Sequence, residues 1–397
     1  MKKQNYSAVL NGKNRHIVLF GKFGSGKTSI FECLVGDVTV KMGNSKFSPI
    51  MGICKLGREG EATIIDTADL NGAVELDNDS EAIRRTFNLI RRADIAIYVV
   101  DLQEFDREAY QHDHDWLEEN NIPYLLAFNH CDEAYIGEIA RIKLEFPDAV
   151  FISTQTPGSI SVLRARLSQM IRTIEMNEAP LVPKGFIEPG DYVVMLVSQS
   201  NGHQIRDEHE LLDELIHCGA RCVIAEEREM TKVLEELPHV DLVISSARSF
   251  EMIRDLLPED IRLTSYSLLY GYQSGELDAF ADGARAIEGL NNDSRVLIAE
   301  NSINHTAHSD IGHVKIPRAL RRIAGEGLQI DYCVGLDLPD NLNEYALVID
   351  DSSGAMTQRL VQARVDICRE AGVPIANYGT VLAQLAGVLE RCQNVLK

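Results

Sequence analysis

Residues 21–28 constrain the fold of this chain more than any other part of the sequence. They read Gly-Lys-Phe-Gly-Ser-Gly-Lys-Thr and match the pattern G-x-x-x-x-G-K-[ST] in full. An apolar run at 17–20 leads directly into them, and a helical pattern follows at 29–35. A glycine-rich loop between a strand and a helix is typical of α/β domains that bind phosphate groups. The sequence therefore predicts such a domain here, the alternative being an ordinary glycine-rich turn.

The residue types in this loop suit the phosphates of a nucleotide. Glycines let backbone amides approach the phosphates, and the N-terminus of the following helix adds positive potential. Lys27 is expected to reach the β- and γ-phosphates, and Thr28 is expected to coordinate Mg²⁺. The residues predicted to bind the nucleotide in this loop are Gly21, Gly24, Ser25, Gly26, Lys27, Thr28 and Ser29.

Apolar runs alternate with amphipathic stretches from end to end, which is typical of repeated βαβ units. The 397 residues are enough for several domains. Three prolines and two glycines within residues 177–190 indicate a break, and a weaker break falls near residue 290. We therefore expect an N-terminal P-loop domain with a parallel sheet and flanking helices at 1–178, a linker at 179–190, and two smaller α/β domains at 191–288 and 289–397.

The composition excludes several classes of function. A net charge of −21 makes the chain a poor ligand for nucleic acid or anionic membrane, because phosphate groups repel it. No apolar run approaches the roughly 20 residues of a membrane span, and no signal core follows the first residues. The eight cysteines are expected to be mostly reduced thiols. These features predict a cytoplasmic protein.

Polar residues at three later strand ends follow a recognisable order. Asp66 ends the run at 62–65, where a P-loop domain places its second Mg²⁺ contact. Plain alternatives are a strand-end turn for Asp66 and a loop cap for Asn129 and Asp132. The order resembles the small-GTPase module, which implies GTP or GDP as ligand. It implies that Asp132 accepts hydrogen bonds from guanine, Asn129 braces its loop, and Ser153 and Thr154 border the base. The residues implied in hydrolysis are Lys27, Thr28 and Asp66.

The sequence departs from the GTPase pattern at three places. Asp69 stands where the module has a glycine, and a carboxylate beside a triphosphate adds repulsion. His130 replaces a lysine whose stem covers the guanine face, where an imidazole is able to stack. The segment 43–49 has no clear threonine for Mg²⁺, so Ser45 or Ser48 is the substitute. We therefore expect guanine-nucleotide binding with slow turnover.

Local sequences in the rest of the chain resemble the HydF family, whose members are GTPases of [FeFe]-hydrogenase maturation. The resemblance runs from the P-loop to the C-terminal end. It implies a GTPase domain, a dimerisation domain and an iron–sulfur domain. It further implies a homodimeric scaffold that handles the di-iron precursor before transfer to a hydrogenase or maturase client. The stretches that carry it are 263–270, 275–277, 296–300, 310–318 and 372–379.

The chain departs from this family where the family binds a [4Fe–4S] cluster. The resemblance implies three cysteine ligands, in Cys-x-His and in a later His-Cys-x-x-Cys. Ser302 and Asn304 stand at the places of the first motif, and Asp351 and Gly354 stand at the two cysteines of the second. Because thiolates hold such clusters, no [4Fe–4S] cluster is expected here.

The remaining cysteines and histidines give only weak metal signals. Cys218 and Cys222 form a C-x₃-C with no second ligand pair nearby, so packing is the favoured interpretation. His305, His308 and His313 lie within nine positions, where a zinc-like or ferrous ion is the alternative to a solvated loop.

Two functions follow from the sequence. The first is a GTP-binding, slowly hydrolysing HydF-like scaffold in hydrogenase or related metallocofactor maturation, with Mg²⁺ as cofactor. The alternative is a nucleotide-sensing scaffold without catalysis or cluster that serves a different client.

Overall fold

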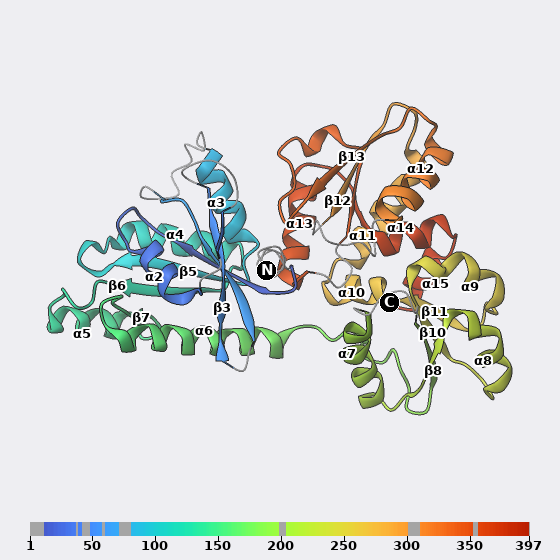
Figure 1. Ribbon diagram of the computed structural model, residues 1–397, viewed down its shortest axis with the longest axis horizontal. Coiled ribbons are helices and arrows are strands. Elements are labelled where there is room, and N and C mark those ends of the chain that lie inside the picture. Colours follow the sequence, from blue (N-terminus) through green and yellow to red (C-terminus); the bar gives the residue numbers. More distant parts are fainter. Residues whose placement is uncertain are drawn as a thin grey trace. The chain divides into compact units, whose positions relative to one another are not determined.

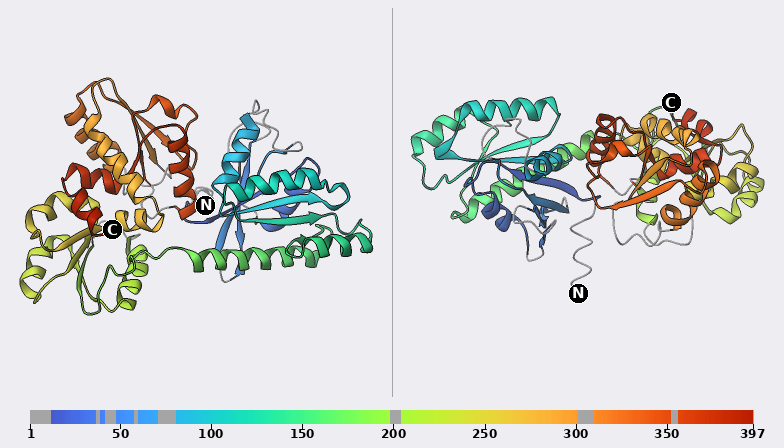
Figure 2. Two further views of the ribbon diagram at one scale, coloured as in Figure 1. Left: turned by 180° about the vertical axis from the view of Figure 1, so that it is seen from behind. Right: turned by 90° about the horizontal axis from the view of Figure 1, so that it is seen from above.

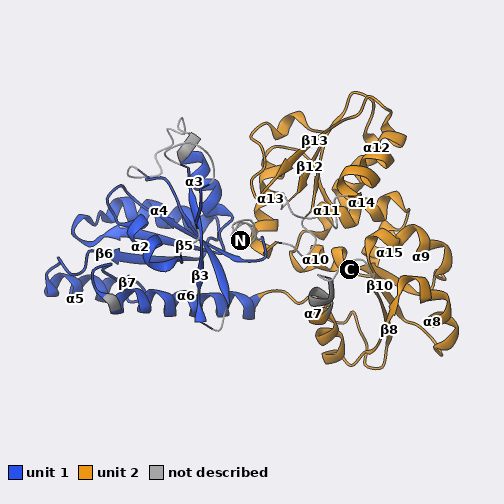
Figure 3. Cartoon of the chain, viewed as in Figure 1, with its two compact units in different colours: residues 1–177 blue, residues 178–397 orange. Residues whose placement is uncertain are grey.

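The computed structural model describes residues 12–36, 39–41, 48–57, 60–70, 81–197, 204–300, 310–351 and 356–396. The chain forms two compact units, at residues 1–177 and 178–397 (Figures 1 and 3). Both units combine parallel strands with helices, which confirms the predicted α/β class. No helix within the described ranges is both long enough and apolar enough to cross a bilayer.

A seven-stranded sheet forms the first unit, in the order β2-β3-β4-β1-β5-β6-β7. The strands β4, β1, β5, β6 and β7 run parallel to one another, whereas β2 and β3 form an antiparallel extension beside β4. The strands are β1 (Arg15–Phe20), β2 (Thr39–Lys41), β3 (Ile50–Lys55), β4 (Glu61–Asp66), β5 (Ile95–Asp101), β6 (Tyr124–Asn129) and β7 (Val150–Phe151).

Helices cover both faces of this sheet, because the central strands are apolar on both sides. Ile17 and Leu19 pack with α2 and α6, whereas Val18 and Phe20 pack with α3, α4 and α5 on the opposite face. The long helix α6 is easily followed in Figures 1 and 2. The helices are α2 (Lys27–Leu34), α3 (Glu81–Arg91), η2 (Leu102–Glu104), α4 (Arg107–Glu119), α5 (Ile136–Glu145) and α6 (Pro157–Asn177).

The strand register brings the carboxyl ends of four strands to one edge. Leu19 of β1 pairs with Asp66 of β4, and Asp101 of β5 pairs with Asn129 of β6. The loop after β1 therefore lies among the polar residues that end β4, β5 and β6. Ligands of open parallel sheets bind at this edge.

Two four-stranded parallel sheets form the second unit, in the orders β11-β10-β8-β9 and β13-β12-β14-β15. The strands of the first of these sheets are β8 (Tyr192–Val197), β9 (Arg221–Glu226), β10 (Leu242–Ser245) and β11 (Arg262–Ser265). Those of the other are β12 (Arg295–Glu300), β13 (Gln329–Val334), β14 (Leu347–Asp350) and β15 (Ile375–Asn377).

Nine α-helices and several shorter 3₁₀- or π-helices are described in the second unit. The α-helices are α7 (Gln204–His217), α8 (Met230–Glu236), α9 (Phe250–Leu256), α10 (Tyr266–Gln273), α11 (Leu277–Arg285), α12 (Ile316–Ala324), α13 (Gln358–Glu370), α14 (Tyr378–Leu385) and α15 (Leu389–Asn394). The shorter ones are η3 (Glu227–Glu229), η4 (Ala247–Ser249), η5 (Ala286–Gly289), the π-helix η6 (Ile311–Lys315) and η7 (Leu342–Glu344).

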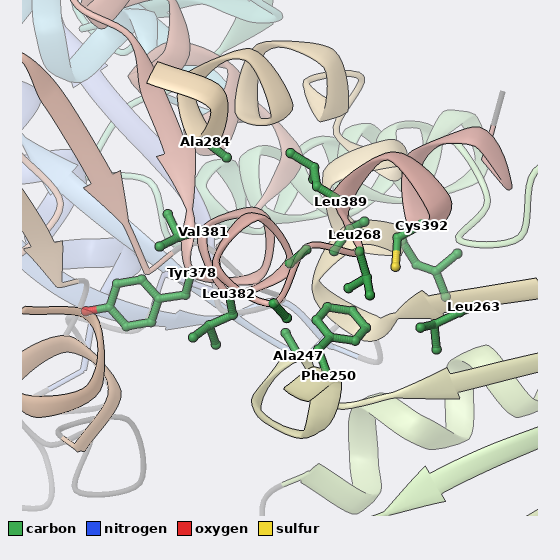
Figure 4. Packing of buried hydrophobic residues seen from close by; sticks show 14 of the residues in the cluster. Ala247, Phe250, Leu263, Leu268, Ala284, Tyr378, Val381, Leu382, Leu389 and Cys392 are labelled. Atoms are coloured by element: carbon green, nitrogen blue, oxygen red, sulfur yellow. The ribbon is translucent and has the colours of Figure 1, made fainter. Parts of the chain in front are cut away.

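One hydrophobic core joins the two sheets of the second unit. Figure 4 shows Leu263 and Phe250, from the first sheet and its helix, beside residues of α14 and α15. Leu389 and Cys392 of α15 are 2% and 0% exposed in this core. The segment predicted as a linker also contributes, since Leu181 is buried there. The C-terminal helices thus complete a core that begins some two hundred residues earlier.

Candidate nucleotide-binding site

The loop between β1 and α2 takes a backbone conformation that requires glycine. Gly21, Gly24 and Gly26 have φ values of 147°, 83° and 87°, which side chains disfavour. Neighbouring atoms also leave no room at two of them. A Cβ on Gly21 would lie 2.2 Å from the backbone oxygen of Val99, and one on Gly26 would lie 2.1 Å from Nδ2 of Asn129. The loop is therefore closely packed against the ends of β5 and β6.

The Lys27 side chain folds back over this loop. Its ammonium donates to the backbone oxygens of Gly21 and Lys22, at 2.9 and 2.8 Å. It also forms an ion pair with Asp69, at 2.7 Å. Thr28 and Ser29 remain exposed at the start of α2. The N-terminal end of α2 is therefore accessible to a ligand. The ammonium of Lys27 is held at the adjoining loop.

Thr28 and Asp66, the predicted Mg²⁺ ligands, lie in contact. The hydroxyl of Thr28 donates to Oδ2 of Asp66 at 2.7 Å. Burial raises the pKa of Asp66, and the hydrogen bond from Thr28 opposes that rise. A hydroxyl beside a carboxylate is the hard-oxygen donor set that Mg²⁺ prefers. The residues present therefore fit the ion.

Three buried polar atoms around the loop find no hydrogen-bond partner within the described part of the chain. They are Oγ of Ser25, Oδ1 of Asp66 and Oδ1 of Asn129. Buried polar atoms in native proteins are nearly always paired, and groups left unpaired at one place point to a missing ligand or ion. Their gathering around one loop makes this edge of the sheet a candidate binding site.

The segment after β6 is tied directly to the glycine-rich loop. Nδ2 of Asn129 donates to the backbone oxygen of Ser25 at 3.0 Å. The next residue, His130, has a φ of 60°, and its Nδ1 lies 2.7 Å from Oδ2 of Asp101. The amide is thus held by the glycine-rich loop and the imidazole by the end of β5, which fixes the segment beside the phosphate loop.

The two predicted base-binding segments, after β6 and after β7, lie side by side. The backbone N–H of Cys131 donates to the oxygen of Ile152 at 3.2 Å, which joins the segment after β6 to the one after β7. Asp132 is exposed, Thr154 is half-buried, and Ser153 is buried with its hydroxyl accepting from the Gln155 N–H. These contacts connect the segments after β6 and β7 with each other and, through Asn129, with the glycine-rich loop.

Three family models match successive parts of the chain. The Hydrogen maturase F dimerization domain matches residues 182–275, and the Hydrogen maturase F tetramerization domain matches residues 278–395. The chain belongs to the HydF family. The 50S ribosome-binding GTPase family matches residues 16–130, which include the phosphate loop and Asn129. The first unit of this HydF-family chain is thus a P-loop domain of the GTP-binding class.

Two solved structures of GTP-binding proteins each resemble about two fifths of this HydF-family chain. The G domain of the T. maritima FeoB iron transporter is 21% identical, with a TM-score of 0.33 over 40% of this chain and 98% of its own. A nucleolar GTP-binding protein 1 from Plasmodium falciparum is 17% identical, with a TM-score of 0.32 over 42% of this chain and 92% of its own. No curated protein matches the chain.

The positions that correspond to the HydF cluster ligands are only partly described. Asp351 is 3% exposed, and its backbone N–H donates to the oxygen of Ala299 at 2.9 Å. Its carboxylate does not fit a cluster that thiolates hold. The described residues contain no group of three or more His, Cys, Asp or Glu arranged for a metal ion. Ser302, Asn304, Gly354, His305, His308 and the substitute ligand Ser45 lie outside the described residues.

The other residues of the weak metal signals are described. Cys218 is exposed and Cys222 is half-buried, and both are free thiols. His313 stacks on Tyr332 with ring centroids 4.4 Å apart, and its Nε2 lies 3.1 Å from a carboxylate oxygen of Glu300. Through these contacts His313 joins η6 to β12 and β13.

Two further residues at the site were not predicted from the sequence. Asp101 holds His130, and its position at the end of the apolar strand β5 is the signal that marks it. Arg164 of α6 donates to the backbone oxygens of Cys33 and Leu34 at 2.8 and 2.9 Å. It therefore caps the C-terminal end of α2, the helix that follows the phosphate loop. An arginine within a long amphipathic helix gives no sequence signal for that contact.

Proposed function

We propose that this chain is a guanine-nucleotide-binding scaffold of the HydF family that hydrolyses GTP slowly. The observation that carries the proposal is the set of three unpaired buried atoms around the phosphate loop, on Ser25, Asp66 and Asn129. Ser25 lies in the loop itself, whereas Asp66 and Asn129 end the strands β4 and β6, so the three atoms gather where a nucleotide with its metal ion would bind. The exposed start of α2 supplies the positive end of a helix dipole beside them.

Each residue has a distinct part in binding. Lys27 presents an ammonium for the phosphates, and the backbone amides of the loop surround them. Thr28 and Asp66 would hold Mg²⁺, which when bound neutralises charge on the phosphate oxygens. Asn129 holds the base-binding segment against the loop through Ser25. Phosphates and base are thereby bound in a fixed relation, with Ser153 and Thr154 bordering the base.

The base is proposed to be guanine. Asp132 is exposed in the turn after β6, so its carboxylate is free to accept from the ring N–H and the exocyclic amine of guanine. Adenine lacks both donors in that arrangement. A site built to accept such bonds rejects a base that cannot make them.

The role of the scaffold is proposed from the family membership. It is the maturation of [FeFe]-hydrogenase or a related metallocofactor, with hydrogenase or maturase proteins as clients. The domains proposed are a GTPase domain at 1–178 and α/β domains at 191–288 and 289–397, joined by 179–190. The carboxylate of Asp351 supports the proposal that this member works without the family's [4Fe–4S] cluster.

A second candidate is a nucleotide sensor without meaningful turnover. The ion pair between Asp69 and Lys27 favours it, because it engages the cation that stabilises charge during phosphoryl transfer. The two functions differ in phosphate release. Under single-turnover conditions with Mg²⁺, the first predicts release from GTP that Lys27→Ala abolishes. Equal release from both proteins would refute hydrolysis at this site, whereas tight binding without release supports the sensor.

A further inference from the structure

The ammonium of Lys27 has no hydrogen-bond donor left for a ligand. An ammonium carries three N–H donors, and Lys27 directs them to Gly21, Lys22 and Asp69, at 2.9, 2.8 and 2.7 Å. Two of these acceptors are backbone oxygens of the phosphate loop itself. The third is a side chain that comes from the segment after β4. A phosphate that binds Lys27 therefore competes with Asp69, the one acceptor able to leave without rebuilding the loop.

We propose that Asp69 acts as a built-in substitute for the γ-phosphate and makes this site select a nucleoside diphosphate over a triphosphate. This inference rests on the proposed nucleotide site. In P-loop proteins the loop lysine reaches the β- and γ-phosphates. The Asp69 oxygen lies 2.7 Å from the same nitrogen, the distance of a charge-assisted hydrogen bond to a phosphate oxygen. A carboxylate already occupies the place that a terminal phosphate would take.

The burial of Lys27 and the charges around it determine the strength of its ion pair with Asp69. The Lys27 side chain is 3% exposed, so its ion pair is poorly screened by water. Asp69 is 39% exposed, so its side chain has room to move away when displaced. A diphosphate brings no γ-phosphate to the place of Asp69, and its β-phosphate is also held by the backbone amides of the loop, so its binding depends less on displacing Asp69. A triphosphate must break the ion pair and then stand beside the Asp66 and Asp69 carboxylates, which repel it.

The same ion pair has a purely structural interpretation. In that case it only stabilises the empty loop, and its removal weakens folding without changing which nucleotide binds. The two interpretations differ in one measurable quantity, the ratio of the dissociation constants for the triphosphate and the diphosphate. A structural role lowers or raises both affinities together, whereas competition with the γ-phosphate changes the triphosphate alone.

The test is calorimetric titration of the full chain with GDP and with a non-hydrolysable GTP analogue, both in Mg²⁺. The variants are Asp69→Gly, which removes the side chain, and Asp69→Asn, which keeps its shape. Glu32→Gln is the matched control, because Glu32 also acts on Asp66 through its charge but is not among the groups that bond Lys27. Thermal unfolding of each variant reports on folding separately.

Wild-type protein is expected to bind GDP about tenfold or more tightly than the analogue. Both Asp69 variants are expected to reduce that ratio by about tenfold, mainly through tighter binding of the analogue, and Glu32→Gln to leave it within about twofold. An unchanged ratio in both Asp69 variants, or a wild-type preference for the analogue, overturns the inference. If no guanine nucleotide binds any of the four proteins, the proposed function itself fails.

Discussion

Arg364 of α13 forms an ion pair with Asp350 at the end of β14, where the two side chains are 2% and 1% exposed. The same guanidinium donates to the backbone oxygen of Gly335, which follows β13, at 2.5 Å. One side chain thus ties two strand ends to a helix. Asp350 directly precedes Asp351, so this ion pair lies beside a position at which the family resemblance places a cluster ligand.

Loss of Arg364 should destabilise the second unit severely. Arg364→Met removes the cation that pairs with the buried Asp350 carboxylate, and breaking a buried ion pair typically costs about 3–5 kcal/mol. Arg369→Met is the matched control on the same helix, because Arg369 is 61% exposed in its ion pair with Asp366 and should lose less than about 1 kcal/mol. Urea unfolding followed by circular dichroism measures both. Equal losses for the two variants would show that the buried pair has no special weight.

The bond between the two loops of the nucleotide site should be needed for affinity. Asn129→Ala removes the donor to Ser25 and leaves a buried backbone oxygen unpaired, at a cost of about 1–3 kcal/mol. We expect GDP affinity to fall by about tenfold or more in calorimetry. Asn341→Ala, in the second unit, is the control and should bind GDP as the wild type does. Unaltered affinity in Asn129→Ala would contradict the role of this bond.

Base selection should depend on Asp132. The wild type is expected to bind GDP in preference to ADP, since only guanine offers both donors to the carboxylate. Asp132→Asn should lose the guanine preference and gain affinity for xanthosine diphosphate, whose ring presents an acceptor in place of the amine. Competition titrations with the three diphosphates measure the order. Equal affinities of the wild type for GDP and ADP would refute the assignment of this loop to the base.

Assembly should give at least a homodimer. The chain contains family dimerisation and tetramerisation domains, and symmetric dimers are the commonest oligomers. Light scattering at micromolar concentration should therefore report twice the 44.2 kDa of one chain, or a higher multiple. A mass of one chain at all concentrations tested would contradict this expectation.

Reconstitution with iron and sulfide under anaerobic conditions should leave the protein without a stoichiometric [4Fe–4S] cluster. Asp351 supplies a carboxylate at a cluster position, and burial raises the pKa of the nearby Cys333 thiol to about 11, which disfavours the thiolate that a cluster needs. Electron paramagnetic resonance and visible absorbance provide the readout. A full cluster signal would mean that other residues are the ligands and that the correspondence with the family is wrong here.

The residues of the candidate nucleotide site could be predicted from the sequence because each of its motifs is local. A complete loop motif fixes residues 21–28, and polar residues directly after apolar runs mark Asp66 and Asn129. Since parallel strands share one carboxyl edge, separate motifs must meet there. The hydrogen bond from Asn129 to Ser25 is the result. The contact of Asp69 with Lys27 depends instead on a side-chain position that no spacing rule provides.

Contacts between distant segments were not predictable in the same way. The βαβ pattern of the sequence does not indicate strands β2 and β3, because they are antiparallel additions to a sheet otherwise made of βαβ units. The approach of α11 to β15 depends on one glycine, since a Cβ on Gly283 would lie 1.9 Å from the backbone oxygen of Ile375. The packing of α15 against β11 joins residues far apart in the chain. Such contacts depend on how the surfaces of distant elements fit together, and the periodicity of apolar residues in the sequence does not specify that fit.

The shared core of the second unit bears on how the chain folds during synthesis. The first unit ends at residue 177 and has all its strands once that residue has left the ribosome. The second unit cannot close in the same stepwise way, because Leu389 and Cys392 fill the core beside Leu263. The sheet of β8 to β11 must therefore wait, with apolar surface exposed, until the last helix emerges. Folding intermediates of this half are the ones expected to engage chaperones.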